Sequence, residues 1–315
     1  MLVEIPGIQY SGKIKEVRIG DGNIVVGGQS SYPLHLFEGE APHSVLIAME
    51  VLDSTPEEWP EALVEVLGDV MNSPGKWAKK CAEQFGADMV CLRLSSIDPN
   101  GANKNAEDVI PVVKEVMETI NIPLIVWGCE NDEKDAEVLP KIAEVCQGKR
   151  IVLGPATDKN YKKIGAAVIA YGHTIVASTP IDVNLAKQLN ILLGDLGVPD
   201  GQIIMDLNTG GCTIGYGLEY TYSVMERQKQ AALTQQDEKL QFPVICNFAN
   251  DVWKKKEVRI DDPGMGDKKK RGILLEAMTG WIQILAGADI LVMRHPDAVK
   301  LVKTALINCG GKSEK

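Results

Sequence analysis

The chain contains 315 residues, of which 45% are hydrophobic and 24% are charged, and its formal net charge is −10. A chain of this length can bury a large core without disulfides or a structural metal, and its acidic balance excludes a general nucleic-acid binder, which needs a basic surface. No apolar stretch approaches the ~20 residues that span a membrane, and the N-terminus lacks the basic and apolar regions of a signal peptide.

The first 43 residues come before any long apolar segment. They contain KIKEVRIG and NIVVGGQ, which are separated by Asp21-Gly22, a pair typical of a β-hairpin turn. We therefore expect residues 1–43 to form an N-terminal hairpin extension that packs on the main domain, rather than an independent domain.

Eight short segments rich in Val, Ile and Leu then follow along the chain. They are VLIAMEV (45–51), MVCLRLS (89–95), PLIVWGC (123–129), RIVLGPA (150–156), TIVASTP (174–180), QIIMDLN (202–208), FPVICNF (242–248) and ILVMRH (290–295). Their nearly continuous apolar character, without alternation, is typical of strands buried on both faces in a parallel sheet.

Segments of helical period lie between these strands. Apolar residues recur at steps of three and four over 109–120, and again over 183–196 after Asp182, a candidate N-cap. A third apolar stripe marks a helix at Leu274, Met278, Ile282 and Leu285.

The alternation of strands and helices within residues 44–315 predicts a closed TIM (β/α)8 barrel, a fold of about 250 residues. The alternative is an open doubly wound sheet, which usually carries a glycine-rich G-x-G-x-x-G turn after its first strand. The first strand here is followed by LDSTPEEWP, which has no such turn, so the barrel is favoured.

Barrels place their sites at the C-terminal ends of the strands. This rule selects Asp182 and Asn184 after the fifth predicted strand, and His295 at the end of the eighth. Each has a plainer interpretation, since Asp182 suits a helix cap and His295, next to Pro296, is equally the start of the last helix.

The sixth strand is followed by NTGGCTIGYGLEY, the stretch richest in glycine. Gly210, Gly211 and Gly215 offer unobstructed amides to a bulky ligand, although a flexible loop would have the same composition. Asp206 and Asn208 share one face of that strand, so both are candidates to point into the barrel mouth, as ligand contacts or as partners of neighbouring loops.

Two further features concern charge and cysteine. Residues 254–271 hold eight basic and four acidic side chains, which suits either a solvated loop or a docking surface for an acidic partner or an acidic cofactor substituent. The seven cysteines include no C-x-x-C pair, and we expect most of them to be buried, reduced thiols of a cytoplasmic protein, with Cys212 in the glycine-rich loop as the exception. Without Walker A, G-x-S-x-G or H-E-x-x-H motifs, we assign neither a metal site nor a catalytic residue.

Several motifs, taken in order, resemble one family. They are HLFEGE (35–40), PGKWAKKC (74–81), DPNGAN (98–103), STPIDVN (178–184), NTGGCTIGYGLEYTYSVMER (208–227) and LVMRHPDAV (291–299). Together they are similar to the small, or delta, subunit of the corrinoid/iron–sulfur protein of the acetyl-CoA decarbonylase/synthase system, also called the CO dehydrogenase/acetyl-CoA synthase system. The resemblance covers almost the whole chain.

The resemblance implies a TIM barrel that forms a heterodimer with a large subunit, which carries a [4Fe–4S] cluster and a corrinoid-binding domain. The corrinoid, a cobalamin, would be held between that domain and the mouth of this barrel. It would take a methyl group from a methyltetrahydropterin, through a methyltransferase, and deliver it to acetyl-CoA synthase in the reductive acetyl-CoA pathway. The chain itself would cover the corrin without ligating cobalt and would not be catalytic alone.

On this resemblance we expect corrin contacts from Asn208, Thr209, Gly210, Gly211 and Gly215, with Asp182, Asn184 and His295 as further cofactor-binding candidates. Two alternatives stay open. One is a stand-alone corrinoid methyltransferase barrel that binds methyltetrahydropterin through Asp206, Asn208 and Asn247. The other is a structural scaffold with no ligand contact.

Overall fold

The computed structural model describes residues 7–20, 24–209 and 216–309, with only the backbone at 208, 209, 216 and 217. Within these ranges the main sheet has eight parallel strands: β3 (Leu46–Leu52), β4 (Met89–Arg93), β5 (Leu124–Trp127), β6 (Val152–Ala156), β7 (Thr174–Pro180), β8 (Ile203–Thr209), β9 (Ile245–Asn247) and β10 (Ile290–Met293). All eight predicted strands are confirmed.

The sheet is a nearly closed barrel, as the sequence predicted. Its strand order is β8-β7-β6-β5-β4-β3-β10-β9, and a parallel bridge between Met205 and Val244 brings β8 against the segment that leads into β9. The strands β4, β5, β6 and β10 are buried at every position, because one face lines the barrel interior and the other packs on helices. This double burial explains why the segments do not alternate.

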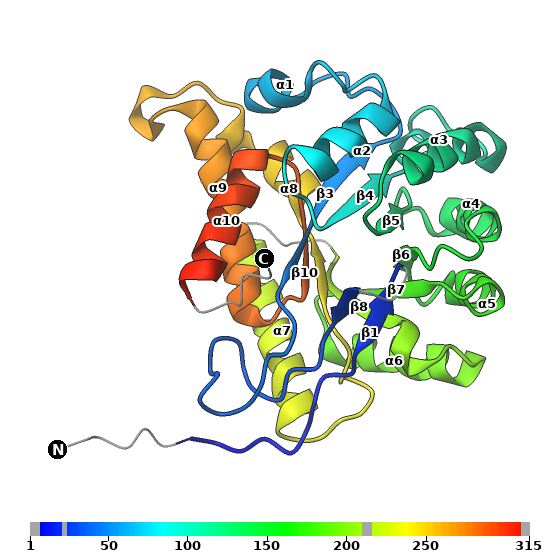
Figure 1. The fold of residues 1–315 in the computed structure, drawn as a ribbon, viewed down its shortest axis with the longest axis vertical. Helices are drawn as coiled ribbons and strands as arrows, with labels where there is room; N and C mark the ends of the chain where they lie inside the picture. The colour runs from blue at the N-terminus through cyan, green and yellow to red at the C-terminus, as the bar shows by residue number, and fades with distance from the viewer. Residues whose placement is uncertain (1–6, 21–23, 210–215, 310–315) are drawn as a thin grey trace.

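The described ranges also contain ten α-helices, which surround the strands in Figure 1. They are α1 (Glu61–Leu67), α2 (Pro74–Glu83), α3 (Ala106–Thr119), α4 (Asp132–Val145), α5 (Tyr161–Tyr171), α6 (Val183–Leu196), α7 (Tyr216–Leu233), α8 (Ala249–Lys254), α9 (Lys268–Ala286) and α10 (Pro296–Asn308). Short 3-10 helices lie at η1 (Ser95–Ile97), η2 (Asp200–Gln202), η3 (Lys256–Val258) and η4 (Pro263–Met265). None of the helices within the described ranges is long and apolar enough to cross a membrane.

Helix α6 begins where the sequence placed its cap. The Asp182 carboxylate accepts the backbone N–H groups of Asn184 at 2.7 Å and Leu185 at 3.2 Å, which satisfies two amides of the first turn. The helix ends at Gly197, whose φ of 98° is the left-handed conformation that favours glycine. The start of α6 therefore lies at the C-terminal end of β7, and its far end lies at the opposite end of the barrel.

The apolar stripe on α9 marks a real helix but lies on its outer side. Leu274 is 51% exposed and Met278 is 55% exposed. The buried side carries glycine where neighbouring side chains approach closely: a Cβ at Gly280 would stand 3.2 Å from Phe248, and one at Gly272 would stand 2.7 Å from Trp253 on α8. Close approach therefore selects glycine at these two positions of the inner face.

The N-terminal hairpin closes one end of the barrel. Strands β1 (Val17–Ile19) and β2 (Ile24–Val26) pair antiparallel, and Val17, Ile19 and Val26 pack in one cluster with interior residues of the barrel strands. The hairpin meets the strands where they begin, since Lys15 N–H donates to Gln241 O at 2.8 Å, just before β9. This leaves the C-terminal ends of the strands as the mouth, whereas the division of domains at residue 43 stays a prediction.

Candidate functional site

The barrel interior changes from apolar to polar towards the mouth. Its inner cluster contains Ala48, Cys91, Ile125, Val176, Ile204, Ile245 and Val292. Two residues further along the same seven strands or their continuations stand Glu50, Arg93, Trp127, Ser178, Asp206, Asn247 and Arg294. Because alternate residues of a strand share a face, these seven side chains lie on the inner face near the C-terminal ends of the strands, and we call this group the mouth layer.

Glu50 is the centre of the mouth layer. It is 1% exposed, and its carboxylate accepts from Arg294 Nε. Its other oxygen, Oε1, stands 3.7 Å from Arg93 Nη1. Two buried guanidinium groups, from β4 and from the end of β10, therefore share one buried carboxylate from β3.

The network continues outward to a second carboxylate. Arg93 Nη2 donates to Glu130 at 2.8 Å, and Trp127 Nε1 donates to the same oxygen at 3.2 Å. Burial lowers the pKa of Arg93, but the carboxylates of Glu130 and Glu50 outweigh this effect and place the pKa above its usual value. Arg93 therefore remains a cation at the mouth, positioned by carboxylates on two sides.

Arg294 is held by three kinds of contact. Besides its pairing with Glu50, its Nη2 donates to Asn250 Oδ1 at 3.1 Å, and its guanidinium lies 5.0 Å from the ring centroid of Trp59. A cation over an aromatic face gains electrostatic attraction without further desolvation of another charge. The loop after β3, which carries Trp59, is thereby linked to the end of β10.

Asp206 faces the barrel interior, as the strand parity predicted. It is 4% exposed, and Ser178 Oγ on the neighbouring strand β7 donates to its Oδ2 at 2.7 Å. The side chain of Asn208, predicted to share this face, lies outside the described atoms. The structure thus shows one of the two predicted inward residues and supplies its partner.

The glycine-rich segment itself lies outside the described residues. This applies to Gly210, Gly211 and Gly215, and also to Cys212, while only the strand backbone of Asn208 and Thr209 is described. Pro180 of β7 pairs with Thr209 of β8. Asp182 and Asn184, both exposed, therefore stand at the strand end next to the start of this segment, and their role in binding stays a prediction.

His295 is buried between the end of β10 and the start of α10. It is 2% exposed, its Nδ1 accepts the N–H of Asp297 at 3.1 Å, and its ring stacks on Trp253 with 5.8 Å between centroids. Burial lowers the pKa of His295, and Asp297 and the Ala62 backbone oppose this shift without reversing it. The ring therefore caps α10 through its Nδ1 atom, and its contact with a cofactor stays a prediction.

Glu276 on α9 fixes the end of β10 through hydrogen bonds to its backbone. Its carboxylate accepts the backbone N–H groups of Arg294 at 2.6 Å and His295 at 3.0 Å. Burial raises the pKa of Glu276 to about 7, while the two amides and the Arg294 charge act in the opposite direction. Sequence periodicity does not reveal this role, because Glu276 and the strand end that it holds are brought together only by the fold.

We expect this carboxyl group to make stability depend on pH. A carboxyl whose pKa is higher in the folded protein binds more protons when folded, so its stabilising effect is present near its ordinary pKa of 4.5 and is lost as the pH rises towards about 7. The unfolding free energy should fall by about 2 kcal/mol between pH 5 and pH 7 through Glu276.

Urea titrations of the wild type and Glu276→Gln at both pH values measure this contribution. The variant should lose most of the decrease, whereas Glu118→Gln, which removes an exposed carboxylate on α3, should keep it. Burial also raises the pKa of Asp135 to about 6. This group therefore adds a decrease in the unfolding free energy with rising pH in all three proteins. An identical decrease in the wild type and Glu276→Gln would contradict the assignment.

Part of the charged segment 254–271 serves the fold. Lys269 pairs with Glu65 and, at 3.2 Å, with Glu61 on α1. Arg271 donates to three backbone carbonyls of the segment, among them Ile260 O at 2.6 Å. These two cations hold the segment together, while the docking role considered for the whole segment stays a prediction.

Most of the cysteines are packing residues. Cys81, Cys91, Cys146 and Cys246 are buried, as the sequence predicted, and burial raises the pKa of Cys81 and of Cys146 to about 12. In the described part of the chain, no three His, Cys, Asp or Glu side chains are grouped so that they could hold a metal ion.

Glu50, Arg93 and Arg294 were not predicted from the sequence as site residues. A signal for them exists: each is a charged residue inside a segment that is otherwise apolar, in AMEVL, CLRLS and LVMRH. A charge in a strand buried on both faces must find a partner or line a polar space, so such positions should be selected before loop residues.

Comparison with known proteins gives the family. Residues 16–307 match the family model described as CO dehydrogenase/acetyl-CoA synthase delta subunit. The acetyl-CoA decarbonylase/synthase complex subunit delta of Archaeoglobus fulgidus is 36% identical over 96% of this chain and 70% of its own length, and that of Methanopyrus kandleri is 34% identical over 94% and 75%.

Solved structures show the same fold at low sequence identity. A dihydropteroate synthase from Xanthomonas albilineans aligns with a TM-score of 0.60 and 12% identity, covering 95% of this chain and all of that one. The enzyme from Thermus thermophilus aligns with a TM-score of 0.56 and 15% identity, covering 88% of this chain and 97% of that one. At these identities the likeness concerns the barrel alone. The family match across the barrel and the identity to curated relatives together place the chain in the CO dehydrogenase/acetyl-CoA synthase delta subunit family.

Proposed function

We propose that the chain is the barrel subunit of a corrinoid methyl-carrier protein. In this role it pairs with a large subunit that binds the corrinoid and carries a [4Fe–4S] cluster, and it covers the corrinoid during methyl transfer. The methyl group comes from a methyltetrahydropterin through a methyltransferase and passes to acetyl-CoA synthase. The proposal is supported by membership in the delta subunit family, whose curated relatives are named as subunits of the acetyl-CoA decarbonylase/synthase complex.

The mouth layer is the observation that carries the proposal. Its ionised groups are engaged with one another, since Glu50 holds two arginines and Asp206 holds Ser178. Groups fixed in this way hold the strand ends and the loops that follow them in place, and a preorganised rim of this kind suits the amide side chains of a corrin. The residues present therefore fit a corrin by their chemistry.

The size of the barrel places such a ligand over the mouth and not within it. The interior of an eight-stranded barrel is just wide enough for side chains to fill, and here the hairpin closes the opposite end. A corrin macrocycle is wider than that interior, so this chain would act as a cover. The bound corrinoid supplies the cobalt that carries the methyl group, and the chain supplies the surface that orients the ring and excludes water.

The rim residues would make the corrin contacts. Asn208, Thr209, Gly210, Gly211 and Gly215 remain our proposal for the sixth strand end, with Asp182 and Asn184 beside them. Asn184 is exposed and contributes only its backbone N–H to the cap contact with Asp182, so its side-chain amide is available to a corrin side chain. His295, being buried, would contribute by keeping the end of β10 in place.

The outer surface of the barrel also suits a subunit. Leu274 and Met278 on α9 and Leu301 on α10 are each more than 40% exposed, at 51%, 55% and 45%. Grouped exposed apolar side chains are typical of surfaces that bind other proteins. This feature supports assembly into a complex but does not by itself select the partner.

Co-expression with and without a corrinoid-binding large subunit tests the proposal. We expect cobalamin absorbance only in the purified heterodimer, and methyl transfer only when both subunits are present. If the isolated chain bound methyltetrahydropterin and methylated free cobalamin, the alternative of a stand-alone methyltransferase would be right. If the corrinoid content of the large subunit did not change on removal of this chain, the structural scaffold would be right.

A further inference from the structure

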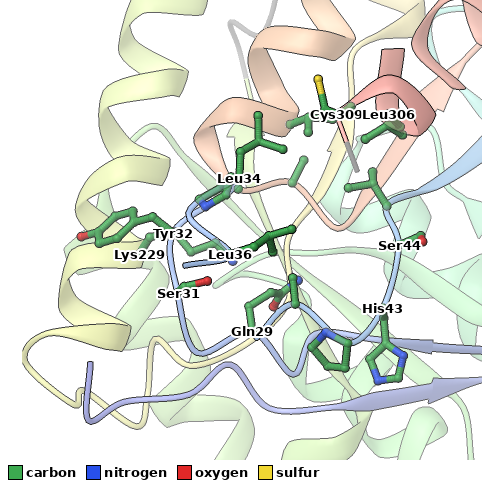
Figure 2. Close-up of a pocket in the computed structure, with 17 residues that line it drawn as sticks. Gln29, Ser31, Tyr32, Leu34, Leu36, His43, Ser44, Lys229, Leu306 and Cys309 are labelled. Carbon is green, nitrogen blue, oxygen red and sulfur yellow. The ribbon is translucent and has the colours of Figure 1, made fainter. Parts of the chain in front are cut away.

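A second cavity lies at the end of the barrel opposite the mouth. Its volume is about 180 Å³, and it is lined by the segment 29–45, by Lys229 of α7 and by the ends of α9 and α10 (Figure 2). Val45 and Ala288, which line it, come directly before β3 and β10, so the cavity lies where these strands begin. It is therefore separate from the proposed corrinoid surface.

Hydrogen bonds hold segment 29–45, which forms one wall of the cavity, in a defined conformation. Its two arms are tied together, since Ser30 N–H donates to Glu40 O at 2.9 Å and Glu40 N–H donates to Ser30 Oγ at 3.0 Å. Gly28 N–H donates to Ile14 O at 3.0 Å and fixes the start of the segment to the chain before the hairpin. These bonds hold Leu34 and Leu36 over the cavity as part of its lining.

Three polar atoms in the lining have no hydrogen-bond partner within the described part of the chain. They are Nζ of Lys229, Oγ of Ser31 and Oε1 of Gln29. Lys229 is 2% exposed and Ser31 is 3% exposed, so bulk water does not compensate them. A buried polar group without a partner carries a desolvation cost, and because these three atoms line one cavity, a polar molecule bound there would satisfy them.

Asp289 lies beside two of these residues, Gln29 and Lys229, but it makes no hydrogen bond to the three unpartnered atoms. Its Oδ1 accepts from Gln29 Nε2, and its Oδ2 accepts from Val244 N–H at 2.8 Å. Lys229 Nζ stands 3.8 Å from Oδ2, beyond hydrogen-bond distance, so the charges are balanced while the ammonium protons remain unused. Because the Gln29 amide nitrogen donates to Asp289, its carbonyl oxygen is the atom left over.

The rest of the lining is mainly aliphatic. Leu34, Leu36, Val45, Ile284 and Leu306 contribute apolar side chains, and in Figure 2 Ser31 and Lys229 lie away from Leu306 and Cys309. The cavity is thus a mainly apolar space whose lining includes a few buried polar groups. A cavity of about 150 Å³ holds a molecule as large as benzene, so this one suits roughly six to nine non-hydrogen atoms.

We propose that this cavity binds a small aliphatic carboxylate that carries a hydrogen-bond donor next to the carboxylate, as in a 2-hydroxy or 2-amino acid. The carboxylate accepts from Lys229 and Ser31, the adjacent hydroxyl or ammonium donates to Gln29 Oε1, and the aliphatic tail packs on Leu34, Leu36 and Leu306. Neither the barrel mouth nor the proposed methyl transfer is needed for this site.

Calorimetric titration of the full chain with four probes tests the site. The probes are 2-hydroxy-4-methylpentanoate, L-leucine, 4-methylpentanoate, which lacks the donor, and 3-methylbutan-1-ol, which lacks the carboxylate. We expect one of the first two to bind one equivalent with a dissociation constant of about 1 mM or tighter, and the last two to bind at least about tenfold more weakly. The stronger of the first two identifies the donor as hydroxyl or ammonium.

Variants separate the site from nonspecific binding. Lys229→Met and Ser31→Ala should weaken binding, the first by about tenfold or more. Leu36→Trp, on an exposed part of the segment, should block the cavity while the fold is preserved, and Ile169→Trp on the exposed face of α5 is the control that should bind normally. Absence of binding by both acids, equal binding of the alcohol, or binding unaffected by Lys229→Met, Ser31→Ala and Leu36→Trp would each overturn the proposal.

Discussion

Replacing Glu50 with alanine should lower the unfolding free energy by about 3–5 kcal/mol, the range seen when one partner of a buried ion pair is removed. Glu50 is 1% exposed and pairs with Arg294, which is 3% exposed, and with Arg93, which is 8% exposed. The variant leaves the Arg294 guanidinium buried without its carboxylate. Urea unfolding followed by circular dichroism measures the loss.

Glu130→Ala is the matched control for this experiment. Glu130 also pairs with Arg93, at 2.8 Å, but its side chain is 48% exposed, so the loss should be below about 1 kcal/mol. The double variant Glu50→Leu with Arg294→Met should recover much of the stability, because it removes the carboxylate together with the Arg294 guanidinium, while Arg93 keeps its pairing with Glu130. A loss for Glu50→Ala no larger than that for Glu130→Ala would show that the mouth layer does not depend on Glu50.

A tryptophan at position 184 should lower the corrinoid content and the methyl-transfer rate of the heterodimer by about tenfold or more. Asn184 is exposed at the first turn of α6, beside the end of β8, where the proposed corrin would lie. A steric conflict worth about 1.4 kcal/mol suffices for a tenfold change in binding. Cobalamin absorbance per heterodimer and single-turnover methyl transfer measure the effect.

Asp195→Trp is the control on the same helix. Position 195 is exposed and lies three turns from position 184 on nearly the same face, ~16 Å away at the opposite end of the barrel. This variant should keep the wild-type corrinoid content. If both variants behaved like the wild type, the β7–β8 rim would not be the corrin surface, and if both lost corrinoid equally, the effect would not come from the mouth.

The sequence alone was a good guide to the barrel. Strands buried on both faces are nearly continuously apolar, so β3 to β10 could be located within a few residues of their bounds. The Asp182 cap was equally accessible, because a capping carboxylate and the amides that it accepts lie within three residues of one another. Both signals are local, and local signals can be read along a chain.

The candidate site was only partly accessible. Asp206 was selected by strand parity, and the structure adds its partner Ser178, which lies on the neighbouring strand. The rule that sites lie at strand ends selects loop residues. It therefore does not select the charged residues Glu50 and Arg93, which lie within strands. The face of α9 was also not predictable, because the close approach of Phe248 and Trp253 decides which side of that helix is inside.

By itself, the sequence determined the number and order of the strands and helices, the closing hairpin and the family. The tertiary structure alone decided which charges meet. Glu50 and Arg294 are 244 residues apart, and no pattern along the chain reports their pairing. The same is true of Lys229 and Gln29, which line one cavity only because segment 29–45 folds against α7 and the start of β10. Periodicity follows from burial of each element on its own, whereas ion pairs and cavities depend on the positions of several elements at once.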